Sequence, residues 1–146
     1  MKRITVLLAD DNKGVRGEFR DLVELEGDLE VVGEAKNGRQ AVAMTKKLRP
    51  AVVLMDIAMP LLNGLQATLQ ILKTLPATKV LMLSAHTEEA YVEAATKSGA
   101  MGYLVKQIAA ESVCSAIREV QKGNTFFTPL SSQLHTEKHK RAARLL

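Results

Sequence analysis

The stretch AVVLMDIAMP (residues 51–60) runs five apolar residues directly into a carboxylate, Asp56, and places Pro60 four positions later. A short, continuous apolar run bounded by turn residues is typical of a strand buried on both faces of a parallel sheet. A charge at the end of such a strand is costly unless it is paired or bound to a metal. Asp56 is therefore the first candidate functional residue.

The same strand pattern recurs along the chain. Apolar runs at 4–9, 30–35, 79–84 and 101–105 are predicted strands. Between and after these runs, apolar residues at helical spacing predict five helices, which end at or just before Gly27, Pro50, Pro76, Gly99 and Gly123. Parallel strands need crossover helices, so the alternation predicts an α/β fold: a five-stranded, doubly wound parallel sheet with five helices.

The length and composition suit one compact domain. The 146 residues are 47% hydrophobic and 25% charged, close to the average for globular proteins. No apolar run is long enough for a transmembrane helix, and two acids follow MKRITVLLA too early for a signal peptide, so a cytoplasmic location is expected. The single Cys114 neighbours Val113 and Ile117 in a helical pattern, and we interpret it as a structural, half-buried thiol.

The excess positive charge is local. The formal net charge is +4, and in residues 131–146 four cations against Glu137 give +3, which leaves +1 for the rest of the chain. Aromatic residues that could stack on bases are scarce, at 3%. We therefore expect the domain itself not to bind nucleic acid, and we interpret residues 124–146 as a basic, linker-like tail.

Polar side chains follow four of the five predicted strands. Asp10 and Asp11 follow the first, Asp56 the third, Ser84 ends the fourth, and Lys106 follows the fifth. The carboxyl ends of parallel strands meet at one edge of the sheet, where ligands bind in this class of fold. Each acid alone also has a structural interpretation, as a helix cap or a turn residue. Together, however, these side chains indicate a single site.

The residue types in this set indicate the chemistry of the site. Clustered carboxylates repel each other unless one is protonated or a cation neutralises them. With only His86 nearby, the ligands are oxygens, which favours Mg2+ over zinc. A carboxylate beside Mg2+ can attack phosphorus and become an aspartyl phosphate. Lys106 would then pair with a phosphate oxygen and the Ser84 hydroxyl would hydrogen-bond another.

These residues and their order resemble the receiver domain of bacterial two-component response regulators. The resemblance covers residues 3 to about 123. It rests on the acidic pair Asp10 and Asp11 after the first strand, Asp56 at the end of the third, and Ser84 at the end of the fourth. It also rests on Tyr103 and Lys106, three apart at the fifth strand, and on Pro60 and Gly64 in the loop after Asp56.

The resemblance implies a flavodoxin-like strand order 2-1-3-4-5 and a role for each site residue. Asp56 would accept a phosphoryl group from a sensor histidine kinase, and Ser84 and Tyr103 would form a conformational switch. Mg2+ would be held by Asp10, largely through water, and by Asp11, Asp56 and the backbone carbonyl of Ala58. Ala58 and His86 would flank the water approach and modulate dephosphorylation. No enzyme activity is implied beyond autophosphorylation and autodephosphorylation.

Within the family, GYLVKQ (102–107) and GNTFFTP (123–129) resemble NarL/FixJ-type regulators, which join a receiver to a helix-turn-helix output domain. We expect a receiver at 1–123, no output domain within residues 124–146, and DNA binding only through such a domain. A truncated regulator and a single-domain regulator both remain open. Homodimers would form through the 88–98 helix, the fifth strand and the last helix, or through the first and last helices. Gln107 stands where many receivers have a proline, which argues against a cis peptide after Lys106.

Three alternatives remain open. A phosphatase of the haloacid dehalogenase class uses similar residues, but its nucleophile lies on the first strand in a D-x-D motif, whereas Asp56-Ile57-Ala58 lacks the second acid. A pseudo-receiver would usually lack the phosphoacceptor or the lysine. In the tail, His135 and His139 are spaced to bind a metal on a helix, although no further ligand accompanies them.

Overall fold

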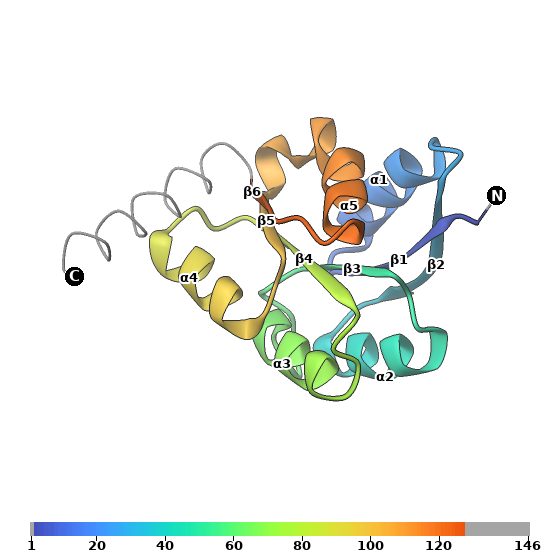
Figure 1. Ribbon diagram of the computed structural model, residues 1–146. Coiled ribbons are helices and arrows are strands. Elements are labelled where there is room, and N and C mark those ends of the chain that lie inside the picture. The colour runs from blue at the N-terminus through green and yellow to red at the C-terminus, as the bar shows by residue number, and fades with distance from the viewer. Residues whose placement is uncertain (1, 128–146) are drawn as a thin grey trace.

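The computed structural model describes residues 2–127, and these form a parallel sheet with helices on both faces (Figure 1). Within this range the sheet has six strands in the order β2-β1-β3-β4-β5-β6. The strands are β1 (Ile4–Ala9), β2 (Leu29–Ala35), β3 (Val52–Met55), β4 (Lys79–Ser84), β5 (Gly102–Val105) and β6 (Phe126–Phe127). The predicted order 2-1-3-4-5 is confirmed.

The helices form two layers. They are α1 (Lys13–Glu24), α2 (Gly38–Leu48), α3 (Gly64–Thr74), α4 (Glu89–Ser98), the 3-10 helix η1 (Lys106–Glu111) and α5 (Val113–Gln121). Buried residues of α2, α3 and α4 pack in one core on one face of the sheet, and those of α1 and α5 pack in a second core on the other. The prediction of a doubly wound sheet is therefore confirmed.

The sixth strand corrects the five-stranded prediction. β6 lies in the stretch interpreted as a linker-like tail, and it pairs in parallel with β5, Phe126 opposite Gly102. A side chain at Gly102 would bring Cβ within 2.1 Å of the Phe126 carbonyl oxygen, so glycine permits this pairing. A two-residue strand carries no periodic signal. The 3-10 helix η1 was not predicted either.

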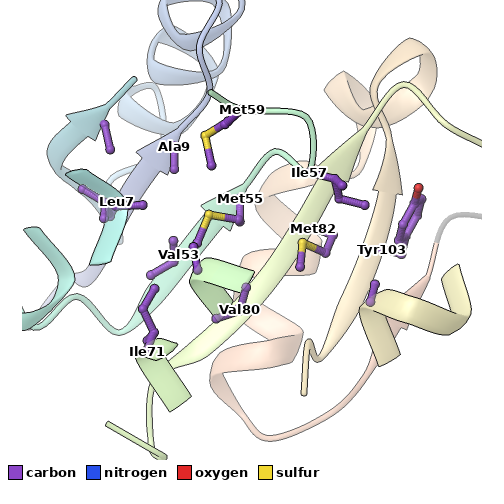
Figure 2. Packing of buried hydrophobic residues seen from close by; sticks show 14 of the residues in the cluster. Leu7, Ala9, Val53, Met55, Ile57, Met59, Ile71, Val80, Met82 and Tyr103 are labelled. Carbon is purple, nitrogen blue, oxygen red and sulfur yellow. The ribbon is translucent and has the colours of Figure 1, made fainter. Parts of the chain in front are cut away.

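Figure 2 shows the core between the sheet and α2–α4, where methionine and branched side chains from β1, β3 and β4 meet. Met55, Met59 and Met82 are buried there. Tyr103 lies in the same core, fully buried at the side of the sheet nearest α4. The core therefore includes Tyr103, one of the two residues expected to act as a switch.

Local sequence explains how the loops at the carboxyl edge turn. The helices α1, α2 and α3 each begin after an asparagine whose side chain accepts a backbone N–H: Asn12, Asn37 and Asn63. Gly64 starts α3 against the end of β3, where a Cβ would lie 2.0 Å from the Asp56 carbonyl oxygen. The loop after Asp56 can therefore close only with glycine at this position.

The backbone and the helices agree with two further features of the sequence. All peptide bonds in residues 2–127 are trans, including the one after Lys106. No helix in that range combines the length and apolar character that crossing a bilayer requires. His135 and His139, whose spacing left a metal site open as an alternative, lie outside the described residues.

Candidate functional site

The carboxyl edge of the sheet brings together the acids that the strand ends predict. Ala9 of β1 lies opposite Met55 of β3, so the residues that follow them, Asp10 and Asp56, emerge side by side. The Asp56 amide donates to the Ala9 carbonyl at 2.8 Å and continues the strand pairing into the site. One carboxylate oxygen from each of Asp10, Asp11 and Asp56 lies within 4.8 Å of the others.

Lys106 reaches this cluster from the end of β5. Its Nζ lies 2.8 Å from Asp10 Oδ2 and 3.4 Å from Asp56 Oδ2. Both carboxylates are about 5% exposed, whereas Asp11 is exposed. Three carboxylates against one ammonium leave a net negative charge in a largely buried place.

Burial and repulsion dominate the proton affinity of Asp56. Burial, followed by the neighbouring charge of Asp10, raises the pKa of Asp56 from 3.8 to about 6, although Lys106 opposes the shift. Burial alone would lower the pKa of Lys106, but its contacts with Asp10 and Asp56 outweigh this and raise it. At neutral pH the Asp56 carboxylate is therefore mostly ionised, although burial and the Asp10 charge disfavour this form. A bound cation would stabilise the ionised form.

One buried oxygen of the cluster, Asp10 Oδ2, has no hydrogen-bond partner within residues 2–127 besides the Lys106 ammonium. The other oxygen, Oδ1, accepts from the Asn12 amide at 2.9 Å. The Lys106 contact to Oδ2 is an ion pair. A buried carboxylate oxygen with spare coordination, two acids beside it and only oxygen donors fit a hard divalent cation such as Mg2+.

A second group of residues links the ends of β4 and β5. Ser84 is buried at the end of β4, and its Oγ accepts a hydrogen bond from the His86 amide at 3.1 Å. The Tyr103 hydroxyl donates to the His86 carbonyl at 2.8 Å. Burial raises the pKa of this phenol. The two residues expected to form the switch are thus joined through the backbone of His86.

The His86 side chain is held by an aromatic neighbour. Its ring stacks on Tyr91 of α4 with centroids 4.0 Å apart and planes 5° apart. Its Nδ1 lies 3.6 Å from Glu88 Oε2. The sequence does not predict this contact, because a spacing of five residues across a helix start gives no periodic signal.

Ala58 lies exposed in the loop that leaves Asp56. The Met59 and Gly64 amides both donate to the Ile57 carbonyl, at 3.1 and 2.8 Å, and so fix the loop around it. Ala58 is close in sequence to the acid cluster, and its small side chain adds little bulk at the rim. Arg16, which sequence analysis did not single out, donates to the Asp10 carbonyl at 2.7 Å.

The fold and these contacts define a doubly wound α/β protein with an acid and lysine cluster, suited to a metal, at its carboxyl edge. The chain belongs to the response regulator receiver domain family, whose family model matches residues 6–118. Sequence order agrees with this family rather than with the haloacid dehalogenase alternative, since Asp56 follows the third strand.

Curated relatives are regulators of the same kind. The chain is 36% identical over 127 residues to the transcriptional regulatory protein DegU of Brevibacillus brevis, covering 87% of this chain and 54% of the relative. It is 37% identical over 126 residues to the response regulator protein VraR of Staphylococcus aureus, covering 86% and 60%. The chain thus spans a little over half the length of these relatives.

Solved structures agree. A LuxR-family two-component response regulator from Aurantimonas sp. SI85-9A1 superposes with a TM-score of 0.89 at 28% identity, covering 94% of this chain and 99% of that one. The signal receiver domain of the putative response regulator NarL from Mycobacterium tuberculosis gives 0.80 at 32% identity, covering 85% and 100%. The predicted likeness to receivers of NarL/FixJ-type regulators is confirmed.

Proposed function

We propose that this receiver takes part in two-component signalling by accepting a phosphoryl group on Asp56 from a sensor histidine kinase. The observation that carries the proposal is the position of Asp56: buried at the sheet edge, between Asp10 and Lys106, and ionised at neutral pH. A charged carboxylate with little solvation and a nearby ammonium is suited to nucleophilic attack on phosphorus.

In the proposed reaction, a carboxylate oxygen of Asp56 attacks the phosphorus of a phosphohistidine on the kinase. The new O–P bond forms as the P–N bond breaks, and the imidazole leaves. Mg2+, when bound, supplies positive charge that offsets the phosphoryl oxygens. We assign its ligands as Asp11, Asp56 and the Ala58 carbonyl, with Asp10 acting largely through water.

Lys106 and Ser84 would hold the transferred group. Lys106 Nζ already lies 3.4 Å from Asp56 Oδ2 and can exchange its carboxylate contacts for a phosphoryl oxygen. The Ser84 hydroxyl accepts from the His86 amide and can donate its own proton to another phosphoryl oxygen. Each donor comes from the end of a different strand, which keeps the site rigid.

Phosphorylation would act through the β4–α4 connection. If Ser84 shifts toward the phosphoryl group, its contact with His86 changes, and His86 also holds the Tyr103 hydroxyl. Tyr103 is fully buried in this structure, so we propose that phosphorylation strengthens a population with this packing and alters the α4–β5–α5 face. That face, or the α1/α5 face, would contact a homodimer partner.

The remaining assignments concern the whole regulator. We propose that residues 1–123 form the receiver unit of a cytoplasmic protein, and that β6, which follows them, adds a strand to the edge of its sheet. DNA binding would belong to an output domain in the part of the relatives that this chain does not match. Ala58 and His86 would set how readily water reaches the phosphoryl group. An unchanged autodephosphorylation rate in His86→Ala would contradict the role of His86.

The test is acetyl phosphate with Mg2+, followed by intact-mass measurement. The wild type should gain one phosphoryl group and Asp56→Ala none, while Asp21→Asn, which changes an exposed acid of α1, should behave as the wild type. Equal labelling of wild type and Asp56→Ala would refute the assignment. Sustained turnover of p-nitrophenyl phosphate would instead favour a phosphatase.

A further inference from the structure

Arg16 connects the acidic pair to the rest of the fold. It lies in the second turn of α1, and its side chain is only 14% exposed. Its Nη1 donates to the backbone carbonyl of Asp10 at 2.7 Å, and its Nε donates to Glu34 Oε1 on β2 at 3.1 Å. The Arg16 guanidinium thus links α1 to β2 and to Asp10, the first acid of the cluster.

The Arg16 hydrogen bond is one of three that hold Asp10 in place. The Asp10 amide donates to the Ala35 carbonyl at 3.0 Å, and its Oδ1 accepts from the Asn12 amide at 2.9 Å. With the carbonyl also bonded, the oxygen that keeps spare coordination is Oδ2, which faces Lys106. Arg16 therefore acts on the peptide between Asp10 and Asp11, the unit that carries both acids.

A cation so close to the acids would ordinarily compete with a metal for their charge. Glu34 offsets this charge, since its second oxygen is held by Arg20 Nη1 at 2.5 Å while the first pairs with Arg16. Arg20 also pairs with Glu24 at 3.1 Å. The Glu34 contact therefore holds the Arg16 guanidinium in place and reduces its positive charge near the acids.

We propose that Arg16 is a positioning residue that sets the Asp10–Asp11 peptide for divalent-cation binding. This inference rests on the proposed function and adds to it a residue outside the predicted site. Arginine suits the task because its planar fork serves two acceptors in fixed directions, whereas an ammonium is a single point of charge. Groups that orient metal ligands from behind typically change metal affinity 10- to 100-fold when removed.

The experiment measures Mg2+ affinity by isothermal titration calorimetry, with no phosphodonor present. Arg16→Gln should weaken binding by about tenfold or more. Arg16→Lys should also weaken binding, because the two bonds come from two different guanidinium nitrogens, whose positions a single ammonium nitrogen cannot both occupy. The matched control is Arg20→Gln, which removes the other cation on Glu34 but no contact with Asp10, and it should stay within about twofold of wild type.

The amide resonances of Asp11 and Asn12 provide a second measurement, since they should shift in Arg16→Gln and not in Arg20→Gln. Wild-type affinity in Arg16→Gln, an equal loss in both variants, or full rescue by Arg16→Lys would overturn the inference and leave the phosphoacceptor assignment intact. If the wild type itself binds no Mg2+, the proposed function fails as well. Should Arg16→Gln not fold, Arg16→Lys carries the comparison.

Discussion

Replacing Asp56 with asparagine should stabilise the folded protein at neutral and alkaline pH. Burial and the charge of Asp10 raise the pKa of Asp56 to about 6, so ionising this side chain costs more in the folded than in the unfolded chain. Asparagine keeps the shape of the side chain without that cost. The variant that abolishes the proposed chemistry should thus be the more stable protein.

The size of the effect follows from the two pKa values. The rise in the pKa of Asp56 from its ordinary value of 3.8 to about 6 corresponds to about 3 kcal/mol in the free energy of unfolding. Because the folded-state pKa is the higher one, wild-type stability falls as pH rises through this window, and the full penalty is present above it. The gain from Asp56→Asn should therefore be small at pH 4, about 0.5 kcal/mol, and about 3 kcal/mol at pH 8.

Urea denaturation at a series of pH values, in EDTA to remove divalent cations, measures this difference. Asp21→Asn is the matched control, because it replaces an exposed acid of α1 and should shift stability by less than about 0.5 kcal/mol. Adding Mg2+ should stabilise the wild type more than Asp56→Asn. A gain that does not depend on pH, or a less stable Asp56→Asn at pH 8, would refute the electrostatic reasoning.

Other variants test the supporting structure. Gly64→Ala should destabilise the fold by more than about 2 kcal/mol, because its Cβ would lie 2.0 Å from the Asp56 carbonyl oxygen. Gly17→Ala, with open space in α1, should be neutral or stabilising by up to about 1 kcal/mol. Equal losses of thermal stability in the two variants would contradict this steric argument. Lys106→Gln should raise the pKa of Asp56 above about 6, and NMR titration showing no rise would contradict the ion pair. Tyr91→Leu removes the imidazole stack and should speed hydrogen exchange in the β4–α4 connection, so unchanged protection there would count against its bracing role.

The position of the site could be predicted because the fold decides where strand ends lie. Once Asp56 and Asp10 follow adjacent parallel strands, their juxtaposition needs only the register of β1 and β3. Lys106 and Ser84 follow from the same rule for the neighbouring strands. Local sequence and strand topology are therefore enough to predict where most of the site residues lie.

The contacts that support the site could not be predicted in the same way. Arg16 meets Glu34 eighteen residues away, and only the packing of α1 beside β2 brings them together. The His86 and Tyr91 stack depends on how α4 is set against the β4 loop. β6 forms because Gly102 lets a second strand approach, a property of the partner strand rather than of the Phe-Phe segment itself.

The most direct test of the central claim maps the phosphorylated residue. After reaction with acetyl phosphate and Mg2+, borohydride reduction converts an aspartyl phosphate to homoserine, which peptide mass spectrometry locates. The account predicts homoserine at position 56 and at neither Asp10 nor Asp11. Homoserine at either of those acids, or at no acid while phosphoryl groups are incorporated elsewhere, would contradict it.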